Sequence, residues 1–210
     1  MNDRNYKINP EFTLPNVITV ARLTMVPVAF FLLVGKGDNK AAFFVFALAG
    51  LSDFLDGTIA RRTDTVSEFG KLLDPFVDRF LILAGVVGLF VVGRIPLWVL
   101  SILVLRDVYL AIGLTRVKHR GGPQIEVIFT GKLTTALLFA GFSGLILDWP
   151  HTAGLGLTSL NWLPGFNGTE YAVWIWLVYA GVVFSLITAA RYTSIGYADL
   201  FGTSIDKKVQ

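Results

Sequence analysis

Residues 53–61 read DFLDGTIAR and residues 70–78 read GKLLDPFVD, and these two stretches are the most informative part of the sequence. They place four carboxylates, those of Asp53, Asp56, Asp74 and Asp78, between segments that are otherwise apolar. An acidic side chain within a membrane is expensive and usually functional. On helices, the first pair and the second pair would each line one face. Two such faces turned toward each other would hold hard divalent cations, which prefer oxygen ligands.

The composition indicates a polytopic membrane protein. Of the 210 residues, 54% are hydrophobic and only 16% are charged, unlike a soluble domain. Six apolar segments, each near the length of a membrane span, predict an all-α integral membrane protein with six transmembrane helices. The chain, residues 1–210, is predicted to be a single membrane domain with a short N-terminal segment, residues 1–15. The six segments are Asn16–Gly35, Ala41–Ile59, Val77–Val92, Pro96–Leu114, Ile128–Leu147 and Tyr171–Ala190.

Several classes of function are excluded or disfavoured by composition. The chain has no cysteine, so disulfides, thiolate metal sites and thiol nucleophiles are ruled out. The polar N-terminal stretch has no apolar core of the kind found in a cleaved signal peptide. A net charge of +3 does not indicate nucleic acid, and none is expected as a partner.

Lysine and arginine are distributed unevenly between the two ends of the apolar segments. Since cytoplasmic loops carry the excess of positive charge, both termini and the acidic motif are predicted to be cytoplasmic. Asp53 follows Ala41 by roughly 18 Å of helix, which places it within the membrane but nearer the cytoplasmic side. The richer side receives Arg4, Lys7, Arg61, Arg62, Lys71, Arg116, Lys118, Arg120, Arg191, Lys207 and Lys208, and the other side receives Lys36, Lys40 and Arg94.

The spacing D-x2-D-G-x2-A-R-x8-G-x3-D-x3-D resembles the signature of the CDP-alcohol phosphotransferase family, and every fixed position of that signature matches. The resemblance implies an enzyme that transfers a phospho-alcohol group from a CDP-linked donor to an acceptor hydroxyl and releases CMP. It also implies six transmembrane helices with the active site between them near the cytoplasmic side, and a homodimer.

The resemblance further implies which residues form the site. Asp53, Asp56, Asp74 and Asp78 would bind Mg²⁺ or Mn²⁺, as two ions, and Asp78 would also act as the general base. The pocket for the CDP group would be lined by Asp56, Gly57, Ala60, Arg61, Gly70 and Asp74. Independently of the family, four carboxylates balance two divalent ions, and paired metals are a recurrent device for phosphoryl chemistry.

Further cations lie within the predicted spans. Arg22 is in the first, Arg106 in the fourth, and Lys132 near the start of the fifth. Such a cation usually has a partner, so each could form a structural ion pair or a pocket for an anionic acceptor or the donor's diphosphate. We expect the pocket for Arg106 and Lys132, with Arg116 as a further candidate, and leave both alternatives open for Arg22. Arg106 is not expected to pair with Asp107, because neighbouring helical residues do not face one another.

The acceptor is predicted from shorter resemblances. Residues 14–23, LPNVITVARL, resemble the start of the phosphatidylglycerophosphate synthase and cardiolipin synthase branch, whose donor is CDP-diacylglycerol. Residues 105–108, 123–126 and 131–132 are more similar to cardiolipin synthases, whose acceptor is phosphatidylglycerol. The membrane is predicted to be that of a bacterial cell.

Three alternatives stay open at this point. One is a phosphatidylglycerophosphate synthase, which would use glycerol 3-phosphate as acceptor. A second is a cation transporter with the four aspartates as its ion pathway, although such a pathway does not require the glycines and Arg61. The third, a structural scaffold, gives no reason to keep four acids within the membrane.

Overall fold

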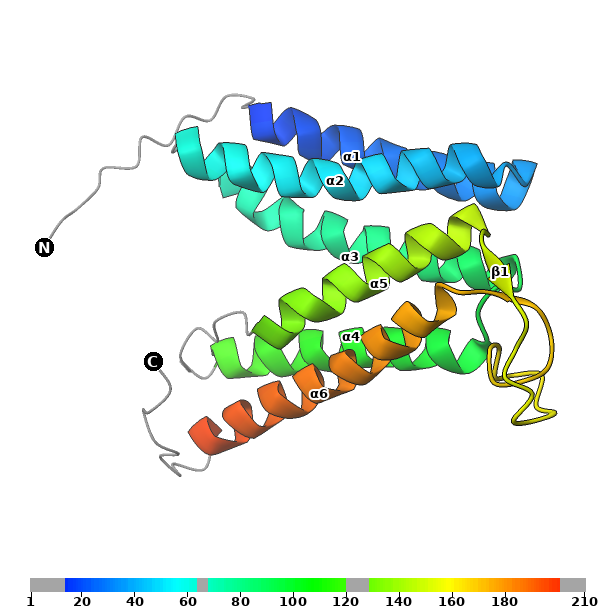
Figure 1. Ribbon diagram of the computed structural model, residues 1–210. Helices are drawn as coiled ribbons and strands as arrows, with labels where there is room; N and C mark the ends of the chain where they lie inside the picture. Colours follow the sequence, from blue (N-terminus) through cyan, green and yellow to red (C-terminus); the bar gives the residue numbers. More distant parts are fainter. Residues whose placement is uncertain (1–13, 64–67, 120–128, 201–210) are drawn as a thin grey trace, which may run out of the picture. The chain divides into compact units, whose positions relative to one another are not determined.

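The computed structural model describes the backbone of residues 14–63, 68–119 and 129–200, and side chains within residues 19–52, 77, 79–113 and 130–194. The described residues are mostly helical (Figure 1). They form two compact units, one of Met1–Arg94 with Phe142–His151 and the other of Ile95–Gly141 with Thr152–Gln210. The prediction of a single domain stays a prediction.

Both units are built mainly of α-helices. The first unit contains α1 (Leu14–Phe30), its π-helical continuation η1 (Phe31–Lys36), α2 (Asn39–Thr63), α3 (Glu68–Val91) and the last residues of α5 (Phe129–Leu147). The second contains α4 (Leu97–His119), the rest of α5 and α6 (Ile175–Leu200). Two short strands, β1 (His151–Thr152) and β2 (Tyr171–Ala172), form a two-stranded sheet in the connection between α5 and α6.

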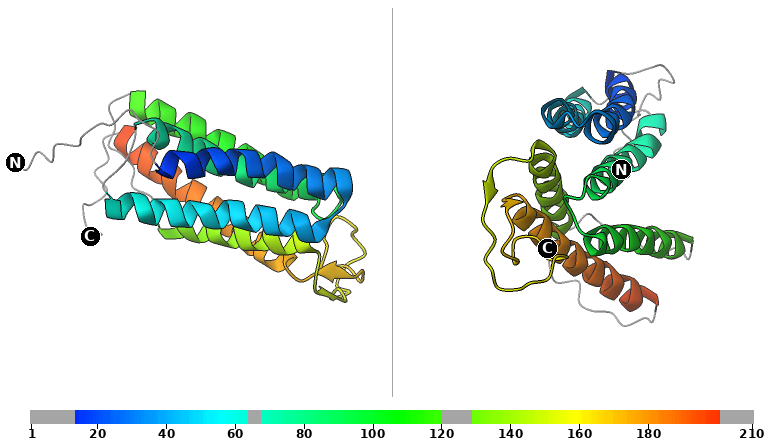
Figure 2. Two further views of the ribbon diagram at one scale, coloured as in Figure 1. Left: turned by 90° about the horizontal axis from the view of Figure 1, so that it is seen from above. Right: turned by 90° about the vertical axis from the view of Figure 1, so that its right-hand side faces the viewer.

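In the first unit, α1 packs against α2 and α3, and α1 runs beside α2 in both views of Figure 2. The face of α1 and η1 that packs is a narrow stripe, because its buried residues recur at helical intervals. This stripe is polar where α1 begins and apolar where η1 ends. Its members are Thr19, Arg22, Val26, Ala29 and Leu33.

Glycines let α3 approach its neighbours closely. A Cβ atom added to Gly85 would lie 2.9 Å from the ring of Phe46 in α2. One added to Gly88 would lie 3.3 Å from both Phe30 and Leu33. Small residues at helix contacts are a common means of packing in membranes, and here each accommodates a large side chain from the adjacent helix.

Arg94 joins three segments at the other end of the first unit. Its guanidinium donates to the carbonyl oxygens of Leu145 and Ile146 at 3.0 and 2.9 Å and to Asn39 Oδ1 at 2.8 Å. It also pairs with Asp148 at 3.1 Å. Burial lowers the pKa of Arg94, and Asp148 opposes that shift. The residue that the sequence indicated only as a topology charge therefore caps α5, whose last carbonyls have no helical partner.

In the second unit, α4 packs against α6, and α5 meets α6 through two glycines. A Cβ atom on Gly141 would lie 2.8 Å from Val178 Cγ2 and 3.0 Å from the Val178 backbone nitrogen. One on Gly181 would lie 2.6 Å from Leu138 Cδ2. The two helices are therefore so close at this point that neither glycine leaves room for a side chain.

The helices agree with the predicted segments except at their ends. Within the described residues, three stretches are long and apolar enough to cross a bilayer: Thr19–Lys36, Thr130–Leu147 and Ile175–Ser194. Two shorter apolar helical stretches are Asn39–Ser52 and Arg79–Val91. A mostly helical membrane protein was predicted correctly, whereas the count of six spans stays a prediction.

The start predicted for the last helix is wrong. Tyr171 and Ala172 belong to β2, and α6 begins at Ile175. Residues 171–174 are apolar and aromatic, so hydropathy does not distinguish them from a span. Their contacts decide the structure instead: Tyr171 accepts a hydrogen bond from Trp176 Nε1 at 2.7 Å.

The close approach of α5 and α6 gives a first prediction. Gly141→Ala should lower the free energy of unfolding by about 1–3 kcal/mol, because the added methyl group meets backbone that cannot move easily. The matched control is Gly113→Ala in α4, where an added Cβ has nothing within 4 Å. That change should be neutral or stabilise by up to about 1 kcal/mol through helix propensity. Unfolding in one detergent measures both, and equal effects would contradict the packing.

Candidate metal and substrate site

The buried stripe of α2 leads into the acidic motif. Ala42, Phe46 and Ala49 are buried, and α2 continues without a break to Thr63. Positions 53, 56 and 60 extend the same alternation of four and three residues. Asp53 and Asp56 therefore occupy the helical register of the stripe that packs farther along α2.

Counting along the two helices, we expect the acids of α3 to lie at about the level of those of α2. The two helices are joined by four residues, 64–67, and short connections of this kind join antiparallel helices. Phe46 lies against Gly85. Seven residues correspond to roughly 10 Å of helix. Counting seven residues onward in α2 and seven back in α3 from that contact, we expect position 53 to lie at about the level of position 78. Likewise, we expect position 56 at about the level of position 75, beside Asp74.

The side chains of the motif lie outside those that the structure describes. This applies to Asp53, Asp56, Gly57, Ala60, Arg61, Gly70, Asp74 and Asp78, and also to Arg116 in α4. Among the side chains that are described, no group of three or more histidines and acids could hold a metal ion. Backbone register and the described neighbours therefore carry the geometry of the site.

Arg22 marks the edge of the motif. Its side chain is fully buried, with 0% of the residue exposed. Its Nε donates to Ser52 Oγ at 3.3 Å, and Ser52 directly precedes Asp53 in the chain. A buried guanidinium is thus brought to the turn of α2 where the carboxylates begin. This position is compatible with both alternatives left open for Arg22.

Arg106 pairs with its neighbour, so the prediction that the two would not pair is wrong. Its Nη1 donates to Asp107 Oδ1 at 2.7 Å. Adjacent residues point to different sides of a helix, but the long arginine side chain bends back far enough to reach. Only 16% of the Arg106 side chain is exposed. Its Nε is buried and makes no hydrogen bond within the described part of the chain.

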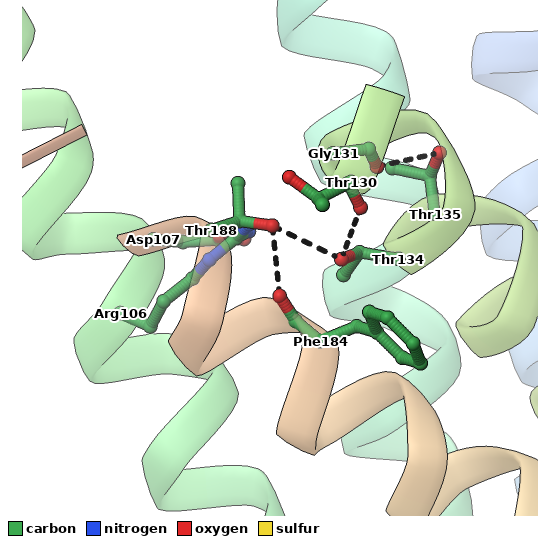
Figure 3. Close-up of polar contacts among 8 residues, drawn as sticks. All are labelled: Arg106, Asp107, Thr130, Gly131, Thr134, Thr135, Phe184 and Thr188. Atoms are coloured by element: carbon green, nitrogen blue, oxygen red, sulfur yellow. Dashed lines mark hydrogen bonds and ion pairs between the residues drawn. The ribbon is translucent and has the colours of Figure 1, made fainter. Parts of the chain in front are cut away.

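Threonines of α5 and α6 form a buried polar cluster in the same unit. The hydroxyl oxygens of Thr134 and Thr188 are 3.4 Å apart, and both residues are fully buried. Each also donates to a carbonyl of its own helix, Thr134 to Thr130 and Thr188 to Phe184. In Figure 3 the Arg106 side chain extends from α4 toward Thr188. Sequence reasoning missed this cluster, because isolated threonines in apolar helices carry no distinctive pattern.

Lys132 differs from Arg106 in its surroundings. It lies in the first turn of α5 and is exposed. Nothing described holds its ammonium group in a fixed position, so a role in a pocket would depend on what approaches that end of α5. Arg106 and Lys132 both belong to the second unit, whereas Arg22 belongs to the first.

Comparisons with known proteins agree with the motif. Residues 12–187 match the family model described as CDP-alcohol phosphatidyltransferase. A protein of Streptomyces coelicolor named cardiolipin synthase (CMP-forming) is 34% identical over 183 residues, which cover 84% of this chain and 85% of the relative. A Bacillus subtilis protein named CDP-diacylglycerol–glycerol-3-phosphate 3-phosphatidyltransferase is 26% identical over 197 residues, covering 87% and 94%.

The burial of Arg22 gives a second prediction. Arg22→Lys should lower the free energy of unfolding by about 1–3 kcal/mol, because lysine has no donor at the position of Nε and the buried hydrogen bond to Ser52 Oγ is lost. Arg191→Lys is the control, since Arg191 is an exposed residue of α6, and it should change stability little. Thermal unfolding in detergent compares them. An Arg22→Lys variant as stable as the control would contradict the assigned contact.

Proposed function

This chain belongs to the CDP-alcohol phosphatidyltransferase family, and we propose that it transfers the phosphatidyl group of CDP-diacylglycerol to phosphatidylglycerol, giving cardiolipin and CMP. The family and the enzyme class predicted from the motif are confirmed, so the transporter and scaffold alternatives fall away. The choice of acceptor rests on the relative named cardiolipin synthase, which is similar to this chain over 84% of its length.

A phosphatidylglycerophosphate synthase remains the second candidate. The relative named for glycerol-3-phosphate transfer covers slightly more of this chain, although at 26% identity. Both candidates share the donor, the leaving group and the acidic motif. They differ in whether the attacking hydroxyl belongs to a lipid or to a small soluble dianion.

The acidic motif is proposed as a site for divalent metal ions, which the family generally uses. Asp53, Asp56, Asp74 and Asp78 would hold two ions, Mg²⁺ or Mn²⁺. The support is the register: counted along α2 and α3, these acids are expected at similar levels, and they continue stripes that are buried farther along. Carboxylate oxygens are the ligands such ions prefer. When bound, the ions neutralise phosphate oxygens and stabilise charge that develops during transfer.

The protein's own residues would orient the donor and move one proton. Gly57 and Gly70 leave room for the nucleotide to approach the helix backbone, and Ala60 keeps the next turn narrow. Arg61 can bind a phosphate through two parallel hydrogen bonds. Asp56 and Asp74 would border the CDP group as well as the metals.

The transfer is a displacement at the phosphorus that carries the diacylglycerol group. Asp78 would accept the proton of the acceptor hydroxyl. The hydroxyl oxygen then forms a bond to that phosphorus, while the bond from the phosphorus to the oxygen of CMP breaks. CMP leaves with the bonding electron pair, and the new phosphodiester joins the two lipids.

Arg106 is the preferred candidate for holding the acceptor phosphate. Its Nε is buried without a partner among the described residues, a situation that costs about 1–3 kcal/mol unless an acceptor atom is supplied. A phosphate oxygen of the acceptor lipid would accept a hydrogen bond from this Nε, while the ion pair with Asp107 keeps the guanidinium oriented. Lys132, Arg116 and Arg22 remain further candidates, and the last can act by orienting the acids rather than by touching the acceptor.

The location follows from the same proposal. The chain is a membrane protein, and we place it in a bacterial cell membrane with both termini and the active site on the cytoplasmic side. Six transmembrane helices and a homodimer, both implied by the family resemblance, complete the proposed assembly.

The experiment for the acceptor is a product assay on the purified chain in lipid nanodiscs, with CDP-diacylglycerol and Mg²⁺ or Mn²⁺. Phosphatidylglycerol and glycerol 3-phosphate are supplied in separate reactions, and mass spectrometry identifies the lipids. Cardiolipin with CMP from the first reaction is the expected result. Phosphatidylglycerophosphate from the second reaction alone would identify glycerol 3-phosphate as the acceptor and leave CDP-diacylglycerol as the donor. Absence of CMP in both reactions would contradict both candidates.

The roles assigned to two aspartates give a third prediction. Asp78→Asn keeps a side-chain oxygen that can bind metal, so it should retain metal and CDP-diacylglycerol binding. It should lose at least about a hundredfold in turnover, because the proton acceptor is gone. Asp56→Ala should instead weaken metal binding. Calorimetric metal titration and CMP release separate the two effects. Near-normal turnover of Asp78→Asn, or unchanged metal affinity of Asp56→Ala, would refute the role concerned.

A fourth prediction concerns the acceptor. Arg106→Gln should raise the KM for phosphatidylglycerol about tenfold or more, the loss of one charged hydrogen bond, and leave the KM for CDP-diacylglycerol nearly unchanged. Arg191→Gln, which removes an exposed arginine of α6, is the matched control and should alter neither. An equal rise in both KM values for Arg106→Gln would assign Arg106 to structure rather than to the acceptor.

A further inference from the structure

The connection before α6 exposes large apolar side chains on a segment that has no charge. Residues 152–169 contain no Asp, Glu, Lys or Arg. Four side chains stand out from it: Leu155 is 57% exposed, Leu157 71%, Leu160 44% and Trp162 53%. Water would be a poor solvent for such a surface. The segment, here called the outer loop, therefore requires another environment.

The outer loop has a defined internal structure, so these side chains are held outward. The Leu155 amide donates to the Gly165 carbonyl at 3.0 Å, and the Leu157 amide donates to the Phe166 carbonyl at 2.9 Å. Asn167 is buried, with 5% exposed, and a Cβ on Gly154 would overlap its carbonyl oxygen. Backbone therefore occupies the interior of the loop at Gly154, and the hydrogen bonds of Leu155 and Leu157 hold their backbone in place.

Two hydrogen bonds hold the outer loop beside the starts of α4 and α6. Trp98, the second residue of α4, donates from Nε1 to the Trp162 carbonyl at 2.9 Å. The Tyr179 hydroxyl donates to the Pro164 carbonyl at 2.9 Å, and Tyr179 lies in the stretch Ile175–Ser194, which is apolar enough to span a bilayer. The loop is drawn beside the first turns of α4 and α6 in Figure 1.

Aromatic rings continue this attachment. The rings of Trp98 and Tyr179 stack with centroids 5.6 Å apart, and Trp162 meets Trp98 edge to face at 6.5 Å. Tryptophan and tyrosine concentrate at the membrane–water boundary, where an apolar ring and a polar group are both satisfied. The level at which the outer loop is fixed is therefore the level of the headgroups.

We propose that the outer loop lies in the plane of the membrane interface, with Leu155, Leu157, Leu160 and Trp162 inserted among the lipids at the end of the bilayer where α6 begins. The partner is the lipid surface itself, because apolar side chains without neighbouring charge, fixed beside a spanning helix, meet lipid first. The inference uses only the geometry of the second unit and does not depend on the proposed reaction.

A cysteine-free chain allows a direct test with the full-length protein. Leu157→Cys and Leu155→Cys each receive a fluorescent nitrobenzoxadiazole label and are reconstituted in phosphatidylcholine vesicles. The matched control is Glu170→Cys, an exposed charged position just past the uncharged segment. Doxyl-labelled phosphatidylcholine should quench the labels at positions 157 and 155 about threefold more strongly than the label at 170, as expected for interfacial insertion. Iodide in the water should show the reverse order.

Two results would overturn the proposal. Equal quenching by iodide at all three positions would place the outer loop in water. Shielding of position 157 from both quenchers, with oxidative cross-linking of two chains of the unlabelled Leu157→Cys variant in dilute vesicles, would assign the surface to a second copy of the chain. Wild-type CMP release by each labelled variant verifies folding, and position 155 gives the same readout if the change at 157 disturbs the fold.

Discussion

Charged side chains cannot be left without partners among apolar helices, and this constraint organises the first unit. The stripe that α1 and η1 bury is apolar from Val26 to Leu33 but polar at Thr19 and Arg22. The stripe of α2 changes in the same way, from Ala42, Phe46 and Ala49 to the aspartates that follow. The helices therefore pack through apolar contacts along part of their length, and those contacts fix the register in which the polar part meets.

Glycines at the helix contacts allow the helices to pack closely. Gly85 and Gly88 receive the rings of α1 and α2, and Gly141 and Gly181 bring α5 against α6. A close contact fixes which residues of two helices lie opposite each other. Because the rise per residue is constant, we expect the pairing about two turns away to follow from that contact. In our proposal, the protein uses this pairing to hold carboxylates near one another despite their mutual repulsion, which bound cations then relieve.

The sequence predicted the helical membrane class and the family well, because hydropathy and the spacing of eight motif residues are both local patterns. It failed where contacts between distant segments decide the outcome. Tyr171 was predicted to begin the last helix because the sequence around it is apolar, but it belongs to the strand β2. Arg94 was used only to predict the orientation in the membrane, whereas its side chain caps the end of α5. The Arg106–Asp107 pair was missed because side-chain flexibility overcame the helical geometry. The roles of the motif aspartates remain predictions, since the described side chains end at Ser52 in α2 and resume at Val77 in α3.

The proposed two-metal site of the four aspartates is tested by electron paramagnetic resonance of Mn²⁺ bound to the purified chain in nanodiscs with CDP-diacylglycerol. We expect two ions for each chain with spin coupling between them, as for metals about 4 Å apart. Replacement of Asp53, Asp56, Asp74 and Asp78 together by asparagine should abolish this signal in a protein that remains helical. Coupled Mn²⁺ that persists in that variant would show that the metals bind elsewhere and that the four aspartates do not form the metal site.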